Sequence, residues 1–183
     1  MKATDILRRE HEVILKGLSV FGTLIQRFED DEPLDPVRVS QLIEFFRQFA
    51  DGCHHAKEEG LLFPILERTG IARAPLRVML AEHDEARAML DALAEAVPLL
   101  MQPSTRYQLV SIANRYISLM KLHIAKENQV LFRIVDQRLD PQSARTLLDQ
   151  FVALKQRQSN ILRSNAEFVR KLDEEYSCGM TTP

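Results

Sequence analysis

The residues best suited to chemistry in this chain are its five histidines and the glutamates that follow two of them at a fixed spacing. Glu58 stands four residues after His54, and Glu127 stands four residues after His123. Residues i and i+4 lie on one face of a helix, one turn apart. Each pair therefore presents an imidazole and a carboxylate to the same point.

The two pairs belong to an internal repeat. The segment that starts at His54 is HHAKEEGLLFPI, and the segment that starts at His123 is HIAKENQVLFRI. Both contain His-x-x-Lys-Glu and then Leu-Phe at the same distance. Residues 10–12 (Glu-His-Glu) likewise match residues 82–84 (Glu-His-Asp). The order along the chain is His, His-x3-Glu, His, His-x3-Glu, which indicates a duplicated helical hairpin.

This repeat favours a metal site with two ions. His11 and His83 would add one imidazole each to the two His-x3-Glu pairs, inside a largely apolar core. Two buried carboxylates that face each other are costly unless cations lie between them. Imidazole and carboxylate suit iron, manganese or zinc, and the lack of thiolate ligands argues against copper(I) and iron–sulfur clusters.

The motifs, their order and their spacing resemble the hemerythrin-like, or HHE cation-binding, family over about residues 4–138. The resemblance implies a four-helix bundle with a non-haem di-iron centre, in which an oxo or hydroxo group also bridges the two iron ions. Manganese and zinc are the secondary choices. Carried over motif by motif, the metal ligands are His11, His54, Glu58, His83, His123 and Glu127, with both glutamates bridging.

The chain departs from the oxygen-carrying members of that family. Arg87 stands where they have a second histidine on the third helix, and Asn128 stands where they have an aspartate. A fifth imidazole is missing unless His55 supplies it. His55 lies about 100° around the helix from His54, so we favour a role outside the ligand set or at the surface. Two other side chains whose contact with metal stays open are Glu59 and Tyr116.

The side chains around these residues are expected to have outer roles. Lys57 and Lys126 occupy matched positions, and we expect both to face outward. Arg87 either pairs with a motif glutamate (Glu58 or Glu59) or is solvated. We expect at most one of four further acidic residues to orient an imidazole: Glu10, Glu12, Glu59 and Glu82.

Five helical blocks must position these residues. Apolar residues recur at helical spacing in each block, and no block alternates as a strand does. The blocks cover about residues 4–28, 36–69, 75–97, 104–138 and 142–176, with proline- and glycine-containing breaks between them. We predict an all-α fold, with an up-down-up-down four-helix bundle in residues 1–138. Residues 139–183 would form a C-terminal helical extension and a short tail.

The fifth block carries a seam of residues spaced alternately by four and three. Such a seam packs on its own bundle or pairs with a second copy. We slightly favour the first outcome and keep a homodimer through the C-terminal helix as the alternative. The seam residues are Leu147, Phe151, Leu154, Gln158, Ile161, Asn165, Phe168 and Leu172.

Composition excludes several classes of partner. The net charge is −2 with both signs interspersed, so no nucleic-acid partner is expected. No stretch approaches the roughly 20 apolar residues that span a bilayer, and no signal peptide is apparent, so no membrane partner is expected either. The two cysteines lie far apart and form no framework, which favours a cytoplasmic location.

Two functions from different classes remain. With two histidines and two bridging carboxylates per iron, each ion keeps an open position, which favours reaction with dioxygen, peroxide or nitric oxide over reversible carriage. The resemblance extends to iron-repair members of the family, which act in nitrosative stress. The alternative is a non-enzymatic iron-binding or regulatory module whose metal state is recognised by a partner protein through the fifth helix. A zinc hydrolase needs an open metal ion with a general base, and the paired bridging glutamates make that reading unattractive. Catalytic residues and turnover are not predicted.

Overall fold

A computed structural model describes residues 1–100 and 102–178 of this chain. The described residues are almost entirely helical and contain no strand, so the all-α prediction is confirmed. The end of the predicted C-terminal tail, residues 179–183, lies outside the described residues. None of the helices in the described segments is both long enough and apolar enough to cross a bilayer.

The first half of the chain forms two long helical segments. Helix α1 covers Ala3–Glu29, and its buried stripe faces the interior. The second segment runs without a break through α2 (Pro36–Phe45), η1 (Phe46–His55), η2 (Glu58–Leu62) and α3 (Phe63–Thr69). The Asp35 carboxylate caps this segment, because it accepts a hydrogen bond from the Val37 amide at 2.8 Å. Gly70 ends it with φ = 72°, a left-handed conformation that glycine tolerates.

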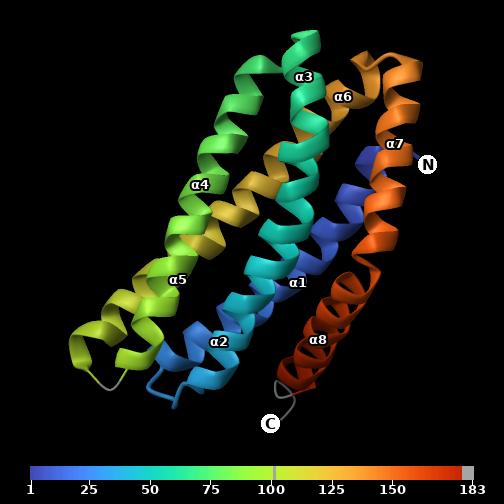
Figure 1. Cartoon of the computed structure of the whole chain (residues 1–183). Helices are drawn as coiled ribbons and strands as arrows, with labels where there is room; N and C mark the ends of the chain where they lie inside the picture. The colour runs from blue at the N-terminus through green and yellow to red at the C-terminus, as the bar shows by residue number, and fades with distance from the viewer. Residues whose placement is uncertain (101, 179–183) are drawn as a thin grey trace.

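The second half repeats this arrangement. Helix α4 covers Arg73–Ala96 and leads into the short helix η3 (Val97–Leu99). A continuous segment then runs through α5 (Pro103–Lys126), η4 (Glu127–Leu131) and α6 (Phe132–Arg138). These long segments lie side by side in Figure 1, with α4 against α5 and α1 against both α5 and η1. The predicted bounds agree with the observed ones to within a few residues.

The motif regions are not regular α-helix, which corrects the expectation from the sequence. The π-helical segment η2 begins at Glu58 and ends at Leu62, and η4 begins at Glu127 and ends at Leu131. The two segments therefore occupy the same register of the repeat. Short π-helical stretches inside α-helices are uncommon and occur frequently at functional sites.

The predicted fifth helix is divided, so the prediction of one continuous helix is wrong. Helix α7 covers Pro141–Arg157 and α8 covers Ser159–Cys178, with a break at Gln158. The predicted seam is buried at Leu147 and Phe151 before the break and at Asn165 and Leu172 after it. Ile161, just beyond the break, is 45% exposed, and Val169 is buried in place of the seam position Phe168. Helix α8 lies along α1 and η1 (Figure 1). The extension therefore packs on its own bundle.

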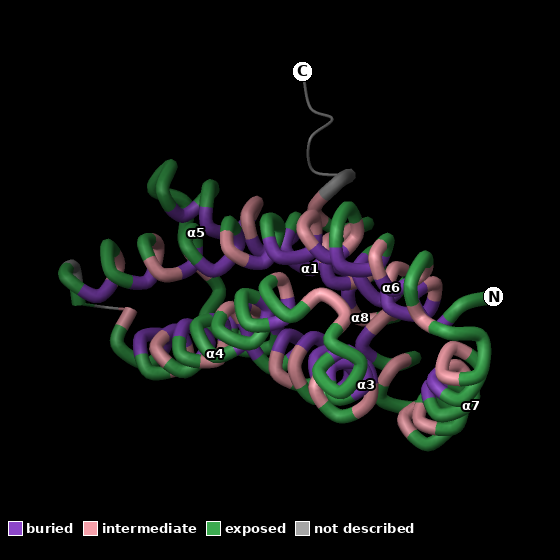
Figure 2. The backbone as a smooth tube through the Cα atoms, turned by 90° about the horizontal axis from the view of Figure 1, so that it is seen from above, coloured by how far each residue is buried: buried purple, intermediate pink, exposed green. Residues whose placement is uncertain are grey.

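Two apolar clusters form the core, and a polar layer lies between them. Along α1, Leu7 belongs to one cluster and Ile14 to the other, and His11 lies between them. Along α4, His83 likewise separates Met79 from Ala86. The buried positions of the helices face one another in Figure 2. The fold thus places the histidines in the middle of the bundle, sealed by apolar side chains at both ends.

Candidate metal centre

The structure brings together all six residues that the sequence singled out as metal ligands. They come from α1, η1, η2, α4, α5 and η4, and each is at most 1% exposed. The six are His11, His54, Glu58, His83, His123 and Glu127.

The four imidazoles form two pairs. The Nε2 atoms of His11 and His54 are 2.9 Å apart, and those of His83 and His123 are 3.2 Å apart. Ligand atoms of each pair lie within 4.8 Å of carboxylate oxygens of the same two glutamates. The cluster therefore has two halves that share both carboxylates.

Each carboxylate spans the two halves. Glu58 places Oε1 at 3.6 Å from His54 Nε2 and Oε2 at 3.5 Å from His83 Nε2. Glu127 Oε2 lies 3.1 Å from His11 Nε2 and 3.4 Å from His123 Nε2. None of these contacts has hydrogen-bond geometry, and all four carboxylate oxygens are buried without a hydrogen-bond partner among the described residues. Buried polar atoms normally have a partner, and a cation bound between these carboxylates would provide one.

Every imidazole in the cluster has an oxygen close to its Nδ1 atom, the ring nitrogen that faces away from the other ligands. Each Nδ1 lies in hydrogen-bond reach of an oxygen on another element, and a proton donated from Nδ1 leaves the lone pair on Nε2. All four Nε2 lone pairs then face the middle of the cluster. The acceptor distances are 3.0 Å for His11 to Asn128, 3.1 Å for His54 to Glu10, 2.7 Å for His83 to Glu59 and 3.0 Å for His123 to Glu82.

The expectation that at most one glutamate would orient an imidazole is wrong, since Glu10, Glu59 and Glu82 all do so. Asn128 is a fourth acceptor that the sequence reasoning missed. The internal repeat could have predicted these acceptors, because Glu59 and Asn128 occupy matched positions directly after Glu58 and Glu127. Glu10 and Glu82 both precede a histidine in the same way. Glu10 and Glu82 each orient a histidine of their own hairpin, whereas Glu59 and Asn128 each orient a histidine of the other hairpin.

The expected outward orientation of Lys57 is also wrong. Its side chain is fully buried, and Nζ donates to Glu10 Oε1 at 2.8 Å and to the Cys53 carbonyl at 2.9 Å. Lys126 contacts Glu82 in the matched position but stays 41% exposed. Of the alternatives for Arg87, the structure shows an ion pair with Glu59.

Burial favours the neutral forms of His54 and His83 and disfavours two charged glutamates. Burial lowers the pKa of His54 well below its usual value, and it lowers the pKa of His83 in the same direction. Burial raises the pKa of Glu58 well above its usual value, and the negative charge of Glu127 raises it further. A cation between the carboxylates would remove this penalty.

The donor set fits two divalent ions. Two nitrogens bonded to one ion at right angles, at about 2.1 Å each, are about 3.0 Å apart, and the observed separations of 2.9 and 3.2 Å lie near this value. A metal-binding histidine normally donates its other ring N–H to a carboxylate or carbonyl. Each Nδ1 here lies within hydrogen-bond reach of such an oxygen. Lone pairs this close would otherwise repel.

The sequence left open whether His55 and Tyr116 contact the metal; His55 borders the cluster, whereas Tyr116 belongs to the apolar core. The His55 ring is buried and stacks on His83, with centroids 3.8 Å apart and an interplanar angle of 17°. Its Nδ1 lies 3.4 Å from Asp51 Oδ1, and its Nε2 has no hydrogen-bond partner among the described residues. Tyr116 packs edge-on against Phe46, and burial raises its pKa well above the usual value.

Fold and site together define a helical protein with a buried histidine–carboxylate centre. The family model for the hemerythrin HHE cation binding domain matches residues 2–135, and the chain belongs to this family.

Curated relatives are similar over part of their length. An uncharacterized protein of Mycobacterium tuberculosis is 28% identical over 133 residues, which cover 71% of this chain and 52% of that protein. The iron-sulfur cluster repair protein YtfE of Escherichia coli is 28% identical over 128 residues, covering 67% of this chain and 58% of YtfE. The chain thus spans about half the length of the curated relatives that it matches. No solved structure gave a significant match.

Proposed function

We propose that this protein is a non-haem di-iron protein that binds or reacts with dioxygen, peroxide or nitric oxide, in redox or stress sensing or in detoxification. One observation carries the proposal: four anchored imidazoles direct their lone pairs at two buried carboxylates that have no hydrogen-bond partners. Membership of a cation-binding family supports it. The similarity to an iron–sulfur cluster repair protein supports iron and a role in stress.

The proposed ligands divide between the two ions. His11 and His54 hold one ion, His83 and His123 hold the other, and the two glutamates bridge. Iron ions at this site would supply electrons to, and attachment points for, a small diatomic molecule or peroxide. The chain itself orients the imidazoles through their Nδ1 acceptors and excludes water with the apolar layers on both sides.

The proposed architecture is an up-down-up-down bundle made of α1, residues 36–69, α4 and residues 103–138. Residues 1–138 would hold the metal centre, and residues 139–183 would be an extension of it. Each of the four segments contributes at least one proposed ligand, which supports this division.

His55 also places a ring nitrogen within 4.8 Å of ligand atoms of His83 and His123, so it is a candidate ligand of the ion held by His83. An imidazole binds a metal ion in the plane of its ring. The rings of His55 and His83 are stacked and nearly parallel, so one ion cannot lie in both planes. We infer that His55 covers this half of the centre rather than ligating the same ion.

A specific observation also favours the alternative, a non-enzymatic iron-binding or regulatory module. Helix α8 packs against α1 and η1, which carry His11 and His54. A change in the metal state can therefore reach the C-terminal helices through direct contacts.

The first experiment measures the metal content and the optical spectrum of the protein. We expect two iron ions per chain. After reduction without air, exposure to oxygen should change the spectrum irreversibly, and peroxide and nitric oxide are then tested in the same way. A change that reverses when oxygen is removed would instead indicate carriage. Unchanged spectra with all three reagents would favour the regulatory alternative, and zinc in the protein as isolated would contradict iron.

The bridging role is tested by Glu58→Ala and Glu127→Ala. Each variant should hold fewer than two ions per chain, because each of the two carboxylates is shared by both halves of the cluster. Glu12→Ala is the matched control, since Glu12 is an exposed glutamate beside His11. Two ions and an unaltered spectrum in either bridging variant would refute the assignment.

A further inference from the structure

A pocket lies between α1, η1 and the two C-terminal helices, partly outside the segment that the family model matches. Its volume is about 310 Å³, at the lower end of the range for small-molecule sites. Helices α7 and α8 contribute Lys155, Leu162, Arg163 and Ala166 to it. The family-matched segment alone could not form this pocket.

The walls of the pocket are largely apolar. Ile6 and Val13 line it from α1, Phe49 from η1, and Leu162 and Ala166 from α8. Phe49 and Ile6 are buried, whereas Val13 and Leu162 are partly exposed. These walls would accept a hydrocarbon or aromatic body.

Three cationic side chains also line this pocket, namely Arg9, Lys155 and Arg163. None of them forms an ion pair with a carboxylate among residues 1–100 and 102–178. Lys171, also on α8, does form such a pair, with Glu167 at 3.1 Å. The pocket therefore carries three positive charges without a carboxylate in ion-pair contact, and Glu10 and Glu167 act on Lys155 and Arg163 only at longer range.

The acidic residue that lines the pocket, Glu10, is paired with interior groups and interacts only weakly with Lys155. Glu10 is 6% exposed, and its oxygens are held by Lys57 Nζ at 2.8 Å and by His54 Nδ1 at 3.1 Å. Its charge is thus balanced from the interior by the buried lysine.

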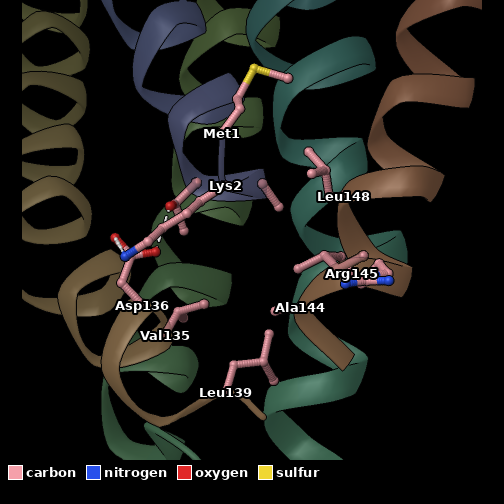
Figure 3. A pocket seen from close by; sticks show the side chains of 11 residues that line it. Met1, Lys2, Val135, Asp136, Leu139, Ala144, Arg145 and Leu148 are labelled. Atoms are coloured by element: carbon pink, nitrogen blue, oxygen red, sulfur yellow. Dashed lines mark hydrogen bonds and ion pairs between the residues drawn. The ribbon is translucent and has the colours of Figure 1, made fainter. Parts of the chain in front are cut away.

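A second pocket, shown in Figure 3, differs in this respect. It has a volume of about 230 Å³ and lies where the N-terminus meets α6 and α7. Its carboxylate, Asp136, is paired with Lys2 at 3.6 Å and with Arg8 at 3.1 Å. Arg145 also lines this pocket and forms no ion pair with a described residue, so this pocket has one such cation, against three in the pocket between α1 and α8.

We propose that the pocket between α1 and α8 is a binding site for an organic anion with an apolar body, of the class of medium-chain carboxylates. The hydrocarbon chain lies between α1 and α8, and the carboxylate meets Arg9, Lys155 and Arg163. Charge-assisted hydrogen bonds from arginine and lysine are the interactions that this head group requires.

The test is a calorimetric titration of the full chain as purified with decanoate, and with decanol as the uncharged probe of the same length. Decanoate should bind saturably at one site and at least about tenfold more tightly than decanol. Its affinity should fall as salt is added, because the cations are exposed. Repeating the titration after treatment with a chelator separates this site from the proposed metal centre.

Variants locate the site. Lys155→Gln together with Arg163→Gln should weaken decanoate binding about tenfold and leave decanol unchanged. Lys171→Gln, which alters an ion-paired lysine of the same helix, is the matched control and should bind decanoate like the parent. Ala166→Phe should fill the pocket and abolish binding, with its circular dichroism unchanged. Equal affinity for decanoate and decanol, or full affinity in the double variant, would overturn the proposal.

Discussion

Glu58 illustrates how strongly a single buried carboxylate constrains this protein. It is fully buried between four imidazoles, and neither of its oxygens has a hydrogen-bond partner in the described chain. Burial and the charge of Glu127 raise its pKa well above the usual value. In metal-free protein the carboxyl group is therefore favoured in its protonated form, and ionising it costs stability.

This predicts how Glu58→Gln changes the pH dependence of stability in chelator-treated protein. A raised folded-state pKa means that the contribution of Glu58 is fully present below its unfolded value of about 4.5 and is lost as pH rises through the folded-state pKa. Glutamine does not ionise. The variant should gain free energy of unfolding relative to the parent as pH rises from 4 to 7, by about 1.4 kcal/mol for each unit of the shift.

Urea unfolding at several pH values measures this difference. Glu12→Gln, at an exposed glutamate next to His11, is the control and should show no such trend. A constant difference between the Glu58 variant and the parent across this pH range would contradict the argument.

The repeat offers a matched pair of lysines for a second prediction. Lys57→Met should lower the free energy of unfolding by about 3–5 kcal/mol, because it leaves Glu10 buried without its partner. Lys126→Met should cost at most about 1 kcal/mol, since Lys126 is 41% exposed. Adding Glu10→Gln to Lys57→Met should recover part of the loss. Equal costs in the two lysine variants, measured by urea unfolding, would show that burial of the pair is unimportant.

At the scale of elements, the duplicated hairpin explains how the centre is assembled. The π-helical segments η2 and η4 begin at corresponding glutamates and end at corresponding leucines. The acceptors for the imidazoles also follow the repeat, since Glu10 on α1 holds His54 and Glu82 on α4 holds His123. Each helix thus positions a proposed ligand on itself and orients one on a neighbour.

Close packing of α1 gives a prediction at this scale. A Cβ at Gly17 would lie 2.5 Å from the Phe45 ring, whereas one at Gly22 would meet only Ile117 at 3.9 Å. Gly17→Ala should therefore destabilise the protein by about 1–3 kcal/mol through overpacking. Gly22→Ala should stabilise it by up to about 1 kcal/mol, because alanine restricts the unfolded chain and favours helix. Thermal unfolding of both variants checks this, and a stabilising Gly17→Ala would show that α1 and α2 are less tightly packed.

For the molecule as a whole, the C-terminal helices complete the core. Leu147 and Phe151 of α7 belong to the same apolar cluster as Leu7. Val169 and Leu172 of α8 belong to the other cluster. Helices α7 and α8 therefore cover apolar surface on both sides of the polar layer that holds the histidines, although the family model ends at residue 135.

Truncation after Arg138 should accordingly expose this surface. We expect residues 1–138 alone to lose cooperative thermal unfolding or to aggregate, because large apolar patches are left without cover. Phe151→Ala in the full chain is the milder variant and should cost about 3–5 kcal/mol. A truncated chain that unfolds cooperatively at the parent temperature would show that the extension is an independent addition.

The sequence alone determined the helical class, the repeat and the six residues that meet in the core. These features are local: an i, i+4 pair shares a helix face whatever the rest of the fold does. Tertiary structure alone decided which oxygen holds each imidazole, that Lys57 is buried, and that α8 starts a new helix after Gln158. Those outcomes depend on contacts such as that between Glu10 and Lys57, 47 residues apart, which no local pattern encodes. The cationic pocket has the same origin, because its charges come from α1, α7 and α8 and meet only when the chain folds.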